Sequence, residues 1–568
     1  MQKNWRAKPI PTPEVVNHLK SVLGIGDILA ILLAQRGIQT FDEAKHFFRP
    51  DKSFLHDPFL MPDMQAAVNR IEVALKKGEK VLLFGDYDVD GTTSVSLMYL
   101  FLKPHHDQLE FYIPDRFLEG YGISQAGIDY AANEGFSLVI SLDCGVKSVE
   151  LIAQAKERGI DFIVCDHHEP GEVLPPAIAV LDAKRKDSNY PYTELSGCGV
   201  GFKLAQALTQ YFVWPEDDLW ALMDFVAVSI ACDIVQMDGE NRALSYLGMQ
   251  KLNANPHPGI KVLLKKAFEK NPKKVYDISD VLFYAGPRIN AAGRLYHAKG
   301  AVELLIEQSE DKAWEFAQAL HLHNEQRRNL EQEISKQAES ELEAMPDFAK
   351  SKSTVAYNPE WNKGVIGIVA SRLVEKYYRP TIVLTRSEGK LAGSARSVGN
   401  FDIHSAIEAC SEHLLQFGGH THAAGLTLKE ENLVAFKAAF EKVVTERIHP
   451  DDLQPSLEYD LEIPLNLIHD KWVDKLMQMN PFGPGNMNPI FMSRKVRDTG
   501  MPKAYGEHLS LNLWAGEQVI GAMAFSQAVN LNAVKQGKLF DICYHIDRSE
   551  FNGKTRLQLR ILDMKPSE

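Results

Sequence analysis

The sequence VLLFGDYDVDGTTS, residues 81–94, gives the strongest indication of the fold. Its first four residues, 81–84, form a short apolar run, as expected of a strand that is buried on both faces. A turn containing Asp86, Asp88 and Asp90 follows directly. Ligands of an open α/β sheet bind beyond the carboxyl ends of its strands, so these carboxylates predict a site there. Aspartates this close together repel one another unless a cation neutralises them, and oxygen ligands suit Mg²⁺ or Mn²⁺.

The spacing of these aspartates also resembles a calcium-binding loop of the D-x-D-x-D-G type. Such a loop ends in a glutamate at its twelfth position, but the twelfth residue counted from Asp86 is Leu97. In addition, a predicted strand precedes the turn, whereas a helix precedes a calcium-binding loop of that type. The strand-to-turn context therefore favours a catalytic metal site over a structural calcium site.

Two further strand ends carry the same kinds of residue. Residues 136–145, FSLVISLDCG, and residues 160–170, IDFIVCDHHEP, each read as an apolar strand that ends in possible metal ligands. A helix is predicted between them over 148–158, so the strands belong to βαβ units and should be parallel, with their carboxyl ends at one edge. The side chains expected to converge there are Asp88, Asp90, Asp143, His167 and His168.

The mixture of aspartate and histidine in this set favours Mn²⁺ over Mg²⁺. A histidine pair such as His167 and His168 is more often structural, or supports a ligand, than it is catalytic. Three successive strands that all end in ligand-type residues are hard to explain by structure alone. We therefore predict a metal centre with a catalytic role at this edge.

The composition is that of an ordinary globular protein. The chain has 568 residues, which suggests three or four domains, and 45% of them are hydrophobic. No apolar run approaches the roughly 18 residues of a membrane span, and the N-terminus lacks the apolar core of a signal peptide. The six cysteines form no CxxC pair, which argues against zinc ribbons and disulfide frameworks and fits a reducing cytoplasm. The net charge of −13 argues mildly against nucleic acid, although bound cations would reverse the effect of clustered carboxylates.

Several longer motifs occur in a fixed order along the chain. They are GDYDVDGTTS (85–94), LDCG (142–145), CDHH (165–168), ACDIV (231–235), GPRINAAGR (286–294), GSARS (393–397) and GGHTHAAG (418–425). Together they resemble the DHH phosphoesterase superfamily. From about Thr40 to the C-terminus the chain is similar to that superfamily's bacterial exonucleases for single-stranded DNA.

The resemblance implies an enzyme that hydrolyses phosphodiester bonds by a two-metal mechanism with Mn²⁺ or Mg²⁺. It implies 5′→3′ degradation of single-stranded DNA in recombination and repair, in the cytoplasm of a bacterium. The implied partners are single-stranded DNA, a single-strand-binding protein and a RecQ-type helicase.

Roles for individual residues follow from the same resemblance. Residues 224–233, DFVAVSIACD, read as an apolar helix that ends in an acid, and an unpaired buried charge is unfavourable, so Asp233 is taken as the last metal ligand. Asp143 is expected to bridge the two ions. His168 is expected to contact the scissile phosphate or to protonate the leaving group, and Asp143 and Asp86 are grouped with it as catalytic. The implied metal ligands are Asp86 at the rim, Asp88, Asp90, Asp143, His167 and Asp233.

A second set of residues is expected to bind phosphate groups of the substrate. Arginine suits phosphate oxygens, and the glycine-rich stretch 286–294 would let a backbone come close to a phosphate. His420 and His422 alternate, so on a strand they would share a face, and a zinc site there would lack a third ligand nearby in the sequence. The implied phosphate-binding residues are Arg116, Arg288, Arg294, Ser394, Arg396, His420 and His422.

The predicted fold class is α/β, with two α/β lobes, the parallel-sheet DHH domain and a DHHA1 domain, joined by a long helix and followed by a C-terminal OB-like β-barrel. Residues 310–345 contain no Gly or Pro, which favours one long helix over a helical hairpin. Five short strands and one short helix near 528–535 suggest the barrel, with Asn552-Gly553 as a hairpin turn. The predicted boundaries are 1–60 for an N-terminal segment packing on the core, 61–309 for the DHH domain, 310–346 for the helix, 347–450 for the DHHA1 domain and 451–568 for the barrel.

Two other functions fit parts of this pattern. One is a relative that hydrolyses small substrates, such as a pyrophosphatase, a nano-RNase or a cyclic-dinucleotide hydrolase. Such enzymes need no module that follows a strand, so the predicted barrel argues against them. The other is a catalytically silent scaffold that binds nucleic acid, which is disfavoured because every expected ligand position carries a ligand residue.

Overall fold

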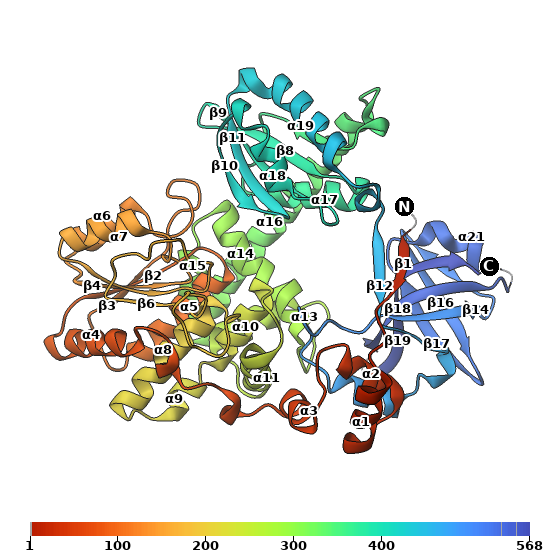
Figure 1. Cartoon of the computed structure of the whole chain (residues 1–568), viewed down its shortest axis with the longest axis horizontal. Coiled ribbons are helices and arrows are strands. Elements are labelled where there is room, and N and C mark those ends of the chain that lie inside the picture. Colours follow the sequence, from red (N-terminus) through yellow and green to blue (C-terminus); the bar gives the residue numbers. More distant parts are fainter. Residues whose placement is uncertain (1–2, 536, 552–553, 568) are drawn as a thin grey trace. The chain divides into compact units, whose positions relative to one another are not determined.

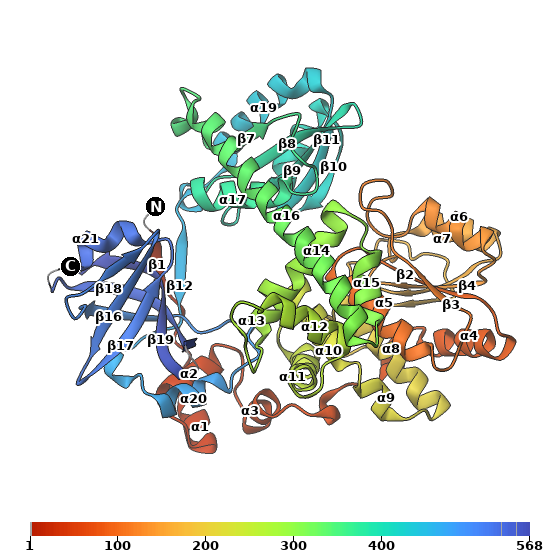
Figure 2. The ribbon, with the colours of Figure 1, turned by 180° about the vertical axis from the view of Figure 1, so that it is seen from behind.

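A computed structural model describes residues 3–535, 537–551 and 554–567 (Figures 1 and 2). The chain divides into two compact units. The first comprises Lys8–Leu322 and Tyr459–Glu568, and the second comprises Met1–Ala7 and His323–Glu458. Among the described residues no single helix is long and apolar enough to cross a membrane, but α1 (Pro13–Leu23) and α2 (Asp27–Ala34), bent by 118°, pass that test as a pair.

A five-stranded parallel sheet, in the order β3-β2-β4-β5-β6, organises the first unit. Every residue of β2 and β4 is buried, in agreement with the continuous apolar runs of the sequence. The last strand, β6, was not predicted. The strands are β2 (Val81–Gly85), β3 (Leu109–Tyr112), β4 (Leu138–Leu142), β5 (Asp161–Cys165) and β6 (Ala179–Leu181).

Helices cover both faces of this sheet (Figures 1 and 2). On one face α4 (Met64–Lys77), α5 (Val89–Leu102) and α8 (Gly197–Phe212) bury alternate strand residues such as Leu83 and Ile140. On the other face α6 (Gln125–Asn133) and α7 (Val149–Glu157) bury the intervening residues, such as Phe84. The predicted α/β class with a parallel sheet is therefore confirmed, and the predicted site lies at the edge where the parallel strands end.

A helical region follows the sheet and packs into the same core. It contains α9 (Glu216–Trp220), α10 (Met223–Asp233), α11 (Gly239–Ala254), α12 (Pro258–Ala267), α13 (Ile278–Asp280), a π-helical turn (Val281–Ala285), α14 (Gly286–Leu295) and α15 (Lys299–Ile306). The predicted long helix is α16 (Glu310–Glu343), and the division between the two units falls within it.

The C-terminal part of the first unit is a barrel with seven strands rather than the five predicted, in the order β13-β14-β18-β19-β17-β16-β15. The chain beyond β14 closes the barrel, because Trp514 donates its backbone N–H to Arg497 O and Thr499 donates to Asn512 O. Asn552 and Gly553, the predicted hairpin turn, lie outside the described residues. The elements are β13 (Leu461–Glu462), α20 (Asp470–Met477), β14 (Phe491–Val496), β15 (Lys503–Tyr505), β16 (His508–Ala515), β17 (Gln518–Ala524), α21 (Leu531–Val534), β18 (Phe540–Phe551) and β19 (Lys554–Pro566).

The N-terminal helices pack on this barrel. Leu19 of α1 and Leu32 of α2 belong to the same buried cluster as Phe491 and Tyr544 of the barrel, and so does Phe47 of α3 (Phe41–Phe48). The N-terminal segment thus packs on the core of the C-terminal barrel. Residues near the two ends of the chain therefore form one hydrophobic cluster.

The second unit has its own five-stranded sheet, in the order β10-β11-β9-β8-β7. Strands β7 and β8 are parallel and the other neighbours are antiparallel. The strands are β7 (Thr354–Tyr357), β8 (Thr381–Ser387), β9 (Lys390–Arg396), β10 (Leu414–His420) and β11 (Ala423–Leu428). The helices are α17 (Ile366–Tyr377), α18 (Ile403–Glu408) and α19 (Leu433–Arg447), and β1 (Asn4–Ala7) pairs with β12 (Ser456–Tyr459).

Arg242 of α11 joins three segments of the first unit. Its guanidinium donates to the carbonyl oxygens of Phe47, Asn480 and Pro481 at 2.9–3.0 Å, and lies 3.7 Å from the centre of the Phe47 ring. The side chain is only 3% exposed, and burial lowers its pKa to about 9. These contacts fix the sheet-containing part of the unit to the N-terminal helices and to the chain that enters the barrel.

Arg242→Met should lower the free energy of unfolding by about 3 kcal/mol, because three buried carbonyl groups lose their donor at about 1 kcal/mol each. Urea titration followed by circular dichroism measures the loss. Arg494→Met is the matched control, since Arg494 is exposed and pairs only with surface carboxylates, its closest partner being Glu462. Equal midpoints for the two variants would show that Arg242 does not join the segments.

Candidate metal centre

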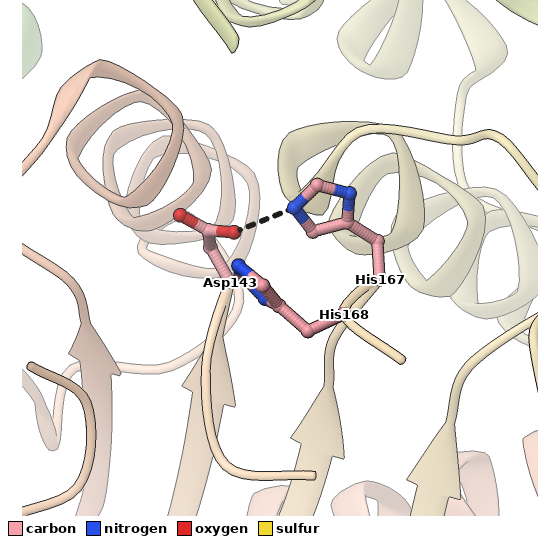
Figure 3. A group of neighbouring side chains, drawn as sticks. All are labelled: Asp143, His167 and His168. Carbon is pink, nitrogen blue, oxygen red and sulfur yellow. Dashed lines mark ion pairs between the residues drawn. The ribbon is translucent and has the colours of Figure 1, made fainter. Parts of the chain in front are cut away.

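The residues predicted to bind metal gather where the parallel strands end (Figure 3). Asp143 follows β4, and His167 and His168 follow β5. Asp233 is the last residue of α10. Two groups of side chains place their ligand atoms within 4.8 Å of one another: Asp143, His167 and His168, and Asp90, His167 and Asp233.

His167 lies at the centre of this cluster. Its Nε2 atom is 3.1 Å from Asp143 Oδ1, 3.6 Å from Asp233 Oδ2 and 3.7 Å from Asp90 Oδ2. Both of its ring nitrogens are buried without a hydrogen bond of good geometry in the described chain, and so is Asp143 Oδ1. Buried polar atoms that converge without hydrogen bonds are unfavourable unless something else satisfies them.

The electrostatics of the cluster indicate that a cation satisfies them. Burial, and after it the charge of Asp90, raises the pKa of Asp143, and the same two effects raise the pKa of Asp233 to about 8. Burial lowers the pKa of His167. The pair Asp143–His167 is therefore not stabilised as an ion pair, although its atoms are close. A divalent cation would favour ionised carboxylates and neutral imidazole, which are the forms that bind metal.

Asp90 differs from the other predicted ligands, because both of its oxygens already accept hydrogen bonds. The backbone N–H groups of Gly197 and Cys198, at the start of α8, donate to it at 2.7 and 2.8 Å, and Ser229 Oγ donates at 2.7 Å. The N-terminus of a helix favours a negative charge, so α8 is a suitable partner for the Asp90 carboxylate. It contributes charge to the cluster and has less free capacity to bind an ion than Asp143.

Asp166 fixes the ring of His168. Its Oδ1 atom lies 2.7 Å from His168 Nδ1, and its carboxylate also accepts backbone N–H groups, including that of Val146 at 2.9 Å. Burial alone would raise the pKa of Asp166, but the bond from His168 and these N–H groups lower it to about 2. Burial lowers the pKa of His168, and its bond to Asp166 outweighs burial and raises it. His168 Nε2 is consequently directed away from Asp166.

Asp86 and Asp88 lie beside the cluster without entering either ligand group. The prediction that Asp86 lies at the rim was wrong, because its side chain is fully buried and accepts the N–H of Gly122 at 3.3 Å. Asp88 caps α5 by accepting the N–H of Gly91. Burial raises the pKa of both carboxyls, and the charge of a neighbouring aspartate adds to it.

Two of the predicted arginines approach this edge through Tyr87. The guanidinium of Arg116 lies 4.9 Å from the centre of the Tyr87 ring. Burial raises the pKa of Tyr87, and the charges of Arg116 and Arg294 oppose this increase. The charges of both arginines therefore act on Tyr87, the residue between Asp86 and Asp88.

The stretch 286–294, which was predicted to let a backbone come close to a phosphate, lies in helix α14. Its glycines allow close packing, since a Cβ atom at Gly286 would meet Cys232 Sγ at 2.6 Å and one at Gly293 would meet Tyr87 O at 2.9 Å. Arg288 is only 7% exposed, and it donates to His321 Nδ1 and to Tyr284 O. These contacts hold the Arg288 side chain in place, so Arg288 would meet a phosphate in a fixed orientation.

The remaining predicted residues belong to the second unit. Arg396 Nη1 donates to Ser394 Oγ at 3.1 Å, and both side chains project from β9 towards the first turn of α17, where a Cβ atom at Gly367 would come 3.0 Å from Ser394 Oγ. His420 ends β10, whereas His422 lies in the turn before β11, so the prediction of a shared strand face was wrong. The chain reverses between His420 and Ala423, which sequence alternation alone does not reveal.

Sequence reasoning missed two charged residues after the unpredicted strand β6. Asp182 is fully buried, and burial raises its pKa to about 7. Lys184 donates its backbone N–H to Asp182, and the charge of Lys184 acts on His167 and Asp233. The apolar run before Asp182 is the same signal that identified Asp143, so it could have been found.

Three family models match successive parts of the chain. The family model for the DHH family, N-terminal domain, matches residues 80–230, that for the DHHA1 domain matches 350–446 and that for the RecJ OB domain matches 459–563. The chain is 33% identical to the single-stranded-DNA-specific exonuclease RecJ of Bacillus subtilis (strain 168) over 98% of this chain and 70% of the relative.

The structure is similar to the crystal structure of RecJ from Thermus thermophilus in complex with Mn²⁺, with a TM-score of 0.84 and 26% identity over 100% of this chain and 80% of that one. The Mg²⁺ complex from the same organism has a TM-score of 0.77 and 24% identity over 100% and 79% of the two chains. Mn²⁺ and Mg²⁺ are the ions that the ligand types predicted.

Asp143→Asn should lower the affinity for Mn²⁺ at least about tenfold, because the side chain keeps its shape but loses its charge. Asparagine also tolerates the positive φ of 61° at this position. Isothermal titration with Mn²⁺ measures the change. Asp224→Asn is the control, since Asp224 is equally buried in α10 but accepts its hydrogen bond from His257 N. Unchanged Mn²⁺ affinity in a folded Asp143→Asn protein would remove Asp143 from the ligand set.

Proposed function

The chain belongs to the family of RecJ single-stranded-DNA-specific exonucleases, and from this premise we propose that it degrades single-stranded DNA in the 5′→3′ direction by a two-metal mechanism. It is a metal-dependent enzyme that hydrolyses phosphodiester bonds of single-stranded DNA, with Mn²⁺ or Mg²⁺ as cofactor. The observation that carries the proposal is the buried cluster around His167, where ligand atoms lie 3.1–3.7 Å from one ring nitrogen. The polarity and the role in recombination and repair rest on the family.

Each predicted residue has a part in this proposal. Bound ions of this kind activate water and stabilise the attacking and leaving oxygens of the phosphodiester. Asp143 would be shared between the two ions, as the family resemblance implies, and Asp86 would support the cluster from the interior. His168, fixed by Asp166, presents Nε2 to the scissile phosphate or protonates the leaving oxygen. The residues that hold the ions are Asp88, Asp90, Asp143, His167 and Asp233.

A separate set of residues binds the rest of the strand. Arg116, Arg288 and Arg294 serve phosphate groups near the aspartate turn. In the second unit, Ser394 and Arg396 bind the terminal phosphate. His420 and His422 provide further contacts. The start of α17 supports this role for Ser394 and Arg396, because helix N-termini favour anions.

The barrel argues against a small-substrate hydrolase as the alternative. It closes through backbone bonds of residues 497–499 and is the kind of module that follows single strands. A catalytically silent scaffold is disfavoured because Asp143 Oδ1 and both ring nitrogens of His167 are buried without a hydrogen bond in the described part of the chain. A single-strand-binding protein and a RecQ-type helicase are proposed as partners on the family resemblance alone. A cytoplasmic location is also proposed, and free cysteines such as Cys144 and Cys165 agree with it.

The direct test is to incubate the purified protein and Mn²⁺ with single strands labelled at the 5′ or the 3′ end, and with the matching duplex. A 5′ label should be released at once as a mononucleotide, whereas a 3′ label should remain on strands that shorten gradually, and the duplex should persist. The Asp143→Asn protein controls for contaminating nucleases. Early release of the 3′ label would reverse the proposed polarity, and equal cleavage of the duplex would contradict the strand specificity.

Arg396→Ala should slow initiation at a 5′-phosphorylated end by a factor of about ten to a hundred, which corresponds to about 1.5–3 kcal/mol for a charge-assisted contact. A terminal phosphate carries more charge than an internal diester, and a guanidinium can bind two of its oxygens. Initial rates on 5′-phosphate and 5′-hydroxyl strands measure the effect.

Arg386→Ala controls for the loss of positive charge in the same unit, because Arg386 is on β8 and pairs with the exposed Glu430. If Arg396→Ala loses the same factor on both kinds of end, Arg396 does not recognise the terminal phosphate. If the unfolding midpoint falls instead, Arg396 serves the stability of its own unit.

A further inference from the structure

Tyr121 connects two residues of the metal centre through one hydroxyl group. Its Oη atom lies 3.1 Å from the backbone carbonyl oxygen of Asp143 and 3.1 Å from His168 Nε2. A carbonyl oxygen can only accept a hydrogen bond, so the phenol donates to Asp143 O and accepts from His168 Nε2. With Asp166 bound to Nδ1 at 2.7 Å, the imidazole of His168 is held at both nitrogens.

The backbone that Tyr121 contacts is strained. Asp143 has a φ of 61°, in the left-handed region that residues other than glycine rarely adopt. Two contacts hold it there: its N–H donates to Cys165 O at 2.8 Å, and its carbonyl accepts from Tyr121. The Asp143 carbonyl is therefore a fixed acceptor, which holds the Tyr121 hydroxyl in place beside His168.

The loop that carries Tyr121 is also held by contacts outside the cluster around His167. Glu119 accepts hydrogen bonds from Tyr112 Oη at 2.9 Å and Asp115 N at 2.7 Å, and Ser124 Oγ also donates to it. These contacts tie the loop to the end of β3 and the start of α6. Gly120 and Gly122 flank Tyr121 with φ values of 87° and 78°, which only glycine adopts readily. The loop thus holds the Tyr121 hydroxyl in a fixed position.

We propose that Tyr121 is a positioning residue, which orients the His168 ring so that its Nε2–H, shared with the Tyr121 hydroxyl, faces the scissile phosphate. This inference rests on the proposed role of His168. The Tyr121 side chain is 52% exposed and meets Tyr87 and His168 only edge-on, at 6.2 and 5.6 Å between ring centres. The ring therefore contributes little packing, and the hydroxyl is the part of the residue that orients His168.

Tyr121→Phe tests the proposal because it removes only the hydroxyl and keeps the ring. We expect kcat on single-stranded DNA to fall about tenfold or more, with KM changed by less than about threefold and Mn²⁺ affinity unchanged. A misaligned His168 affects the transition state, whereas a lost substrate contact would raise KM. Tyr130→Phe is the matched control, since Tyr130 donates its hydroxyl to the surface carboxylate of Glu110 on the same domain.

A double-mutant cycle separates this proposal from the proposed function itself. If Tyr121 acts through His168, adding Tyr121→Phe to His168→Ala should cause no further loss of kcat. Three results would each overturn the role of Tyr121. The losses of kcat in the two single variants could multiply in the double variant, or Tyr121→Phe could raise KM at constant kcat. Tyr121→Phe could also keep full activity although His168→Ala is inactive. Full activity of His168→Ala would instead overturn the role assigned to His168 in the proposed function.

Discussion

The site depends on carboxylates that carry like charges and are buried together at the end of a sheet. Asp86, Asp90 and Asp143 are each at most 1% exposed. Burial opposes ionisation of such groups, and mutual repulsion adds to it, so each one needs either strong donors or a cation. The chain uses both solutions. Asp90 receives the N–H groups of α8 and the Ser229 hydroxyl, whereas Asp143 and His167 retain atoms that suit a metal ion.

The parallel sheet makes this arrangement possible. Strands β2, β4 and β5 are neighbours, so the turns after them meet although they are far apart in the sequence. The first turn of α8 then faces Asp90, and α10 ends at Asp233, so two helices complete an edge that the strands begin. A change of strand order would separate Asp143 from His167 without altering any local sequence pattern.

This explains how much of the site the sequence could reveal. Asp143, His167 and His168 were predicted because each follows a recognisable buried strand and the connections imply parallel strands. The partners of Asp90 were not predicted, since Gly197 and Ser229 lie 107 and 139 residues away. No local pattern connects them, and only the packing of α5 against α8 and α10 brings them together.

Glycine was the least informative residue type, because one pattern fits two structures. In 286–294 the glycines indicated a backbone that could come close to a phosphate, yet Gly286 and Gly293 allow α14 to pack closely on Cys232 and Tyr87. The helices and strands were easier to predict than the segments against which they pack. The barrel and an N-terminal packing segment were both predicted, but a hydrophobic pattern shows only that a face is buried, not that α1 and α2 pack on a barrel more than 400 residues away.

Exposure divides the centre into a buried floor and an accessible rim. The side chains of Asp143 and His167 are 2% and 9% exposed, whereas those of Asp233 and His168 reach 27% and 41%. The floor is governed by charge neutralisation, because its groups cannot be solvated by water. At the rim, Asp233 also needs a cation, because burial raises its pKa to about 8, whereas His168 depends on the orientation that Asp166 gives it. Metal affinity and substrate alignment are therefore set by different residues: Asp143, His167 and Asp233 set the first, and His168 sets the second.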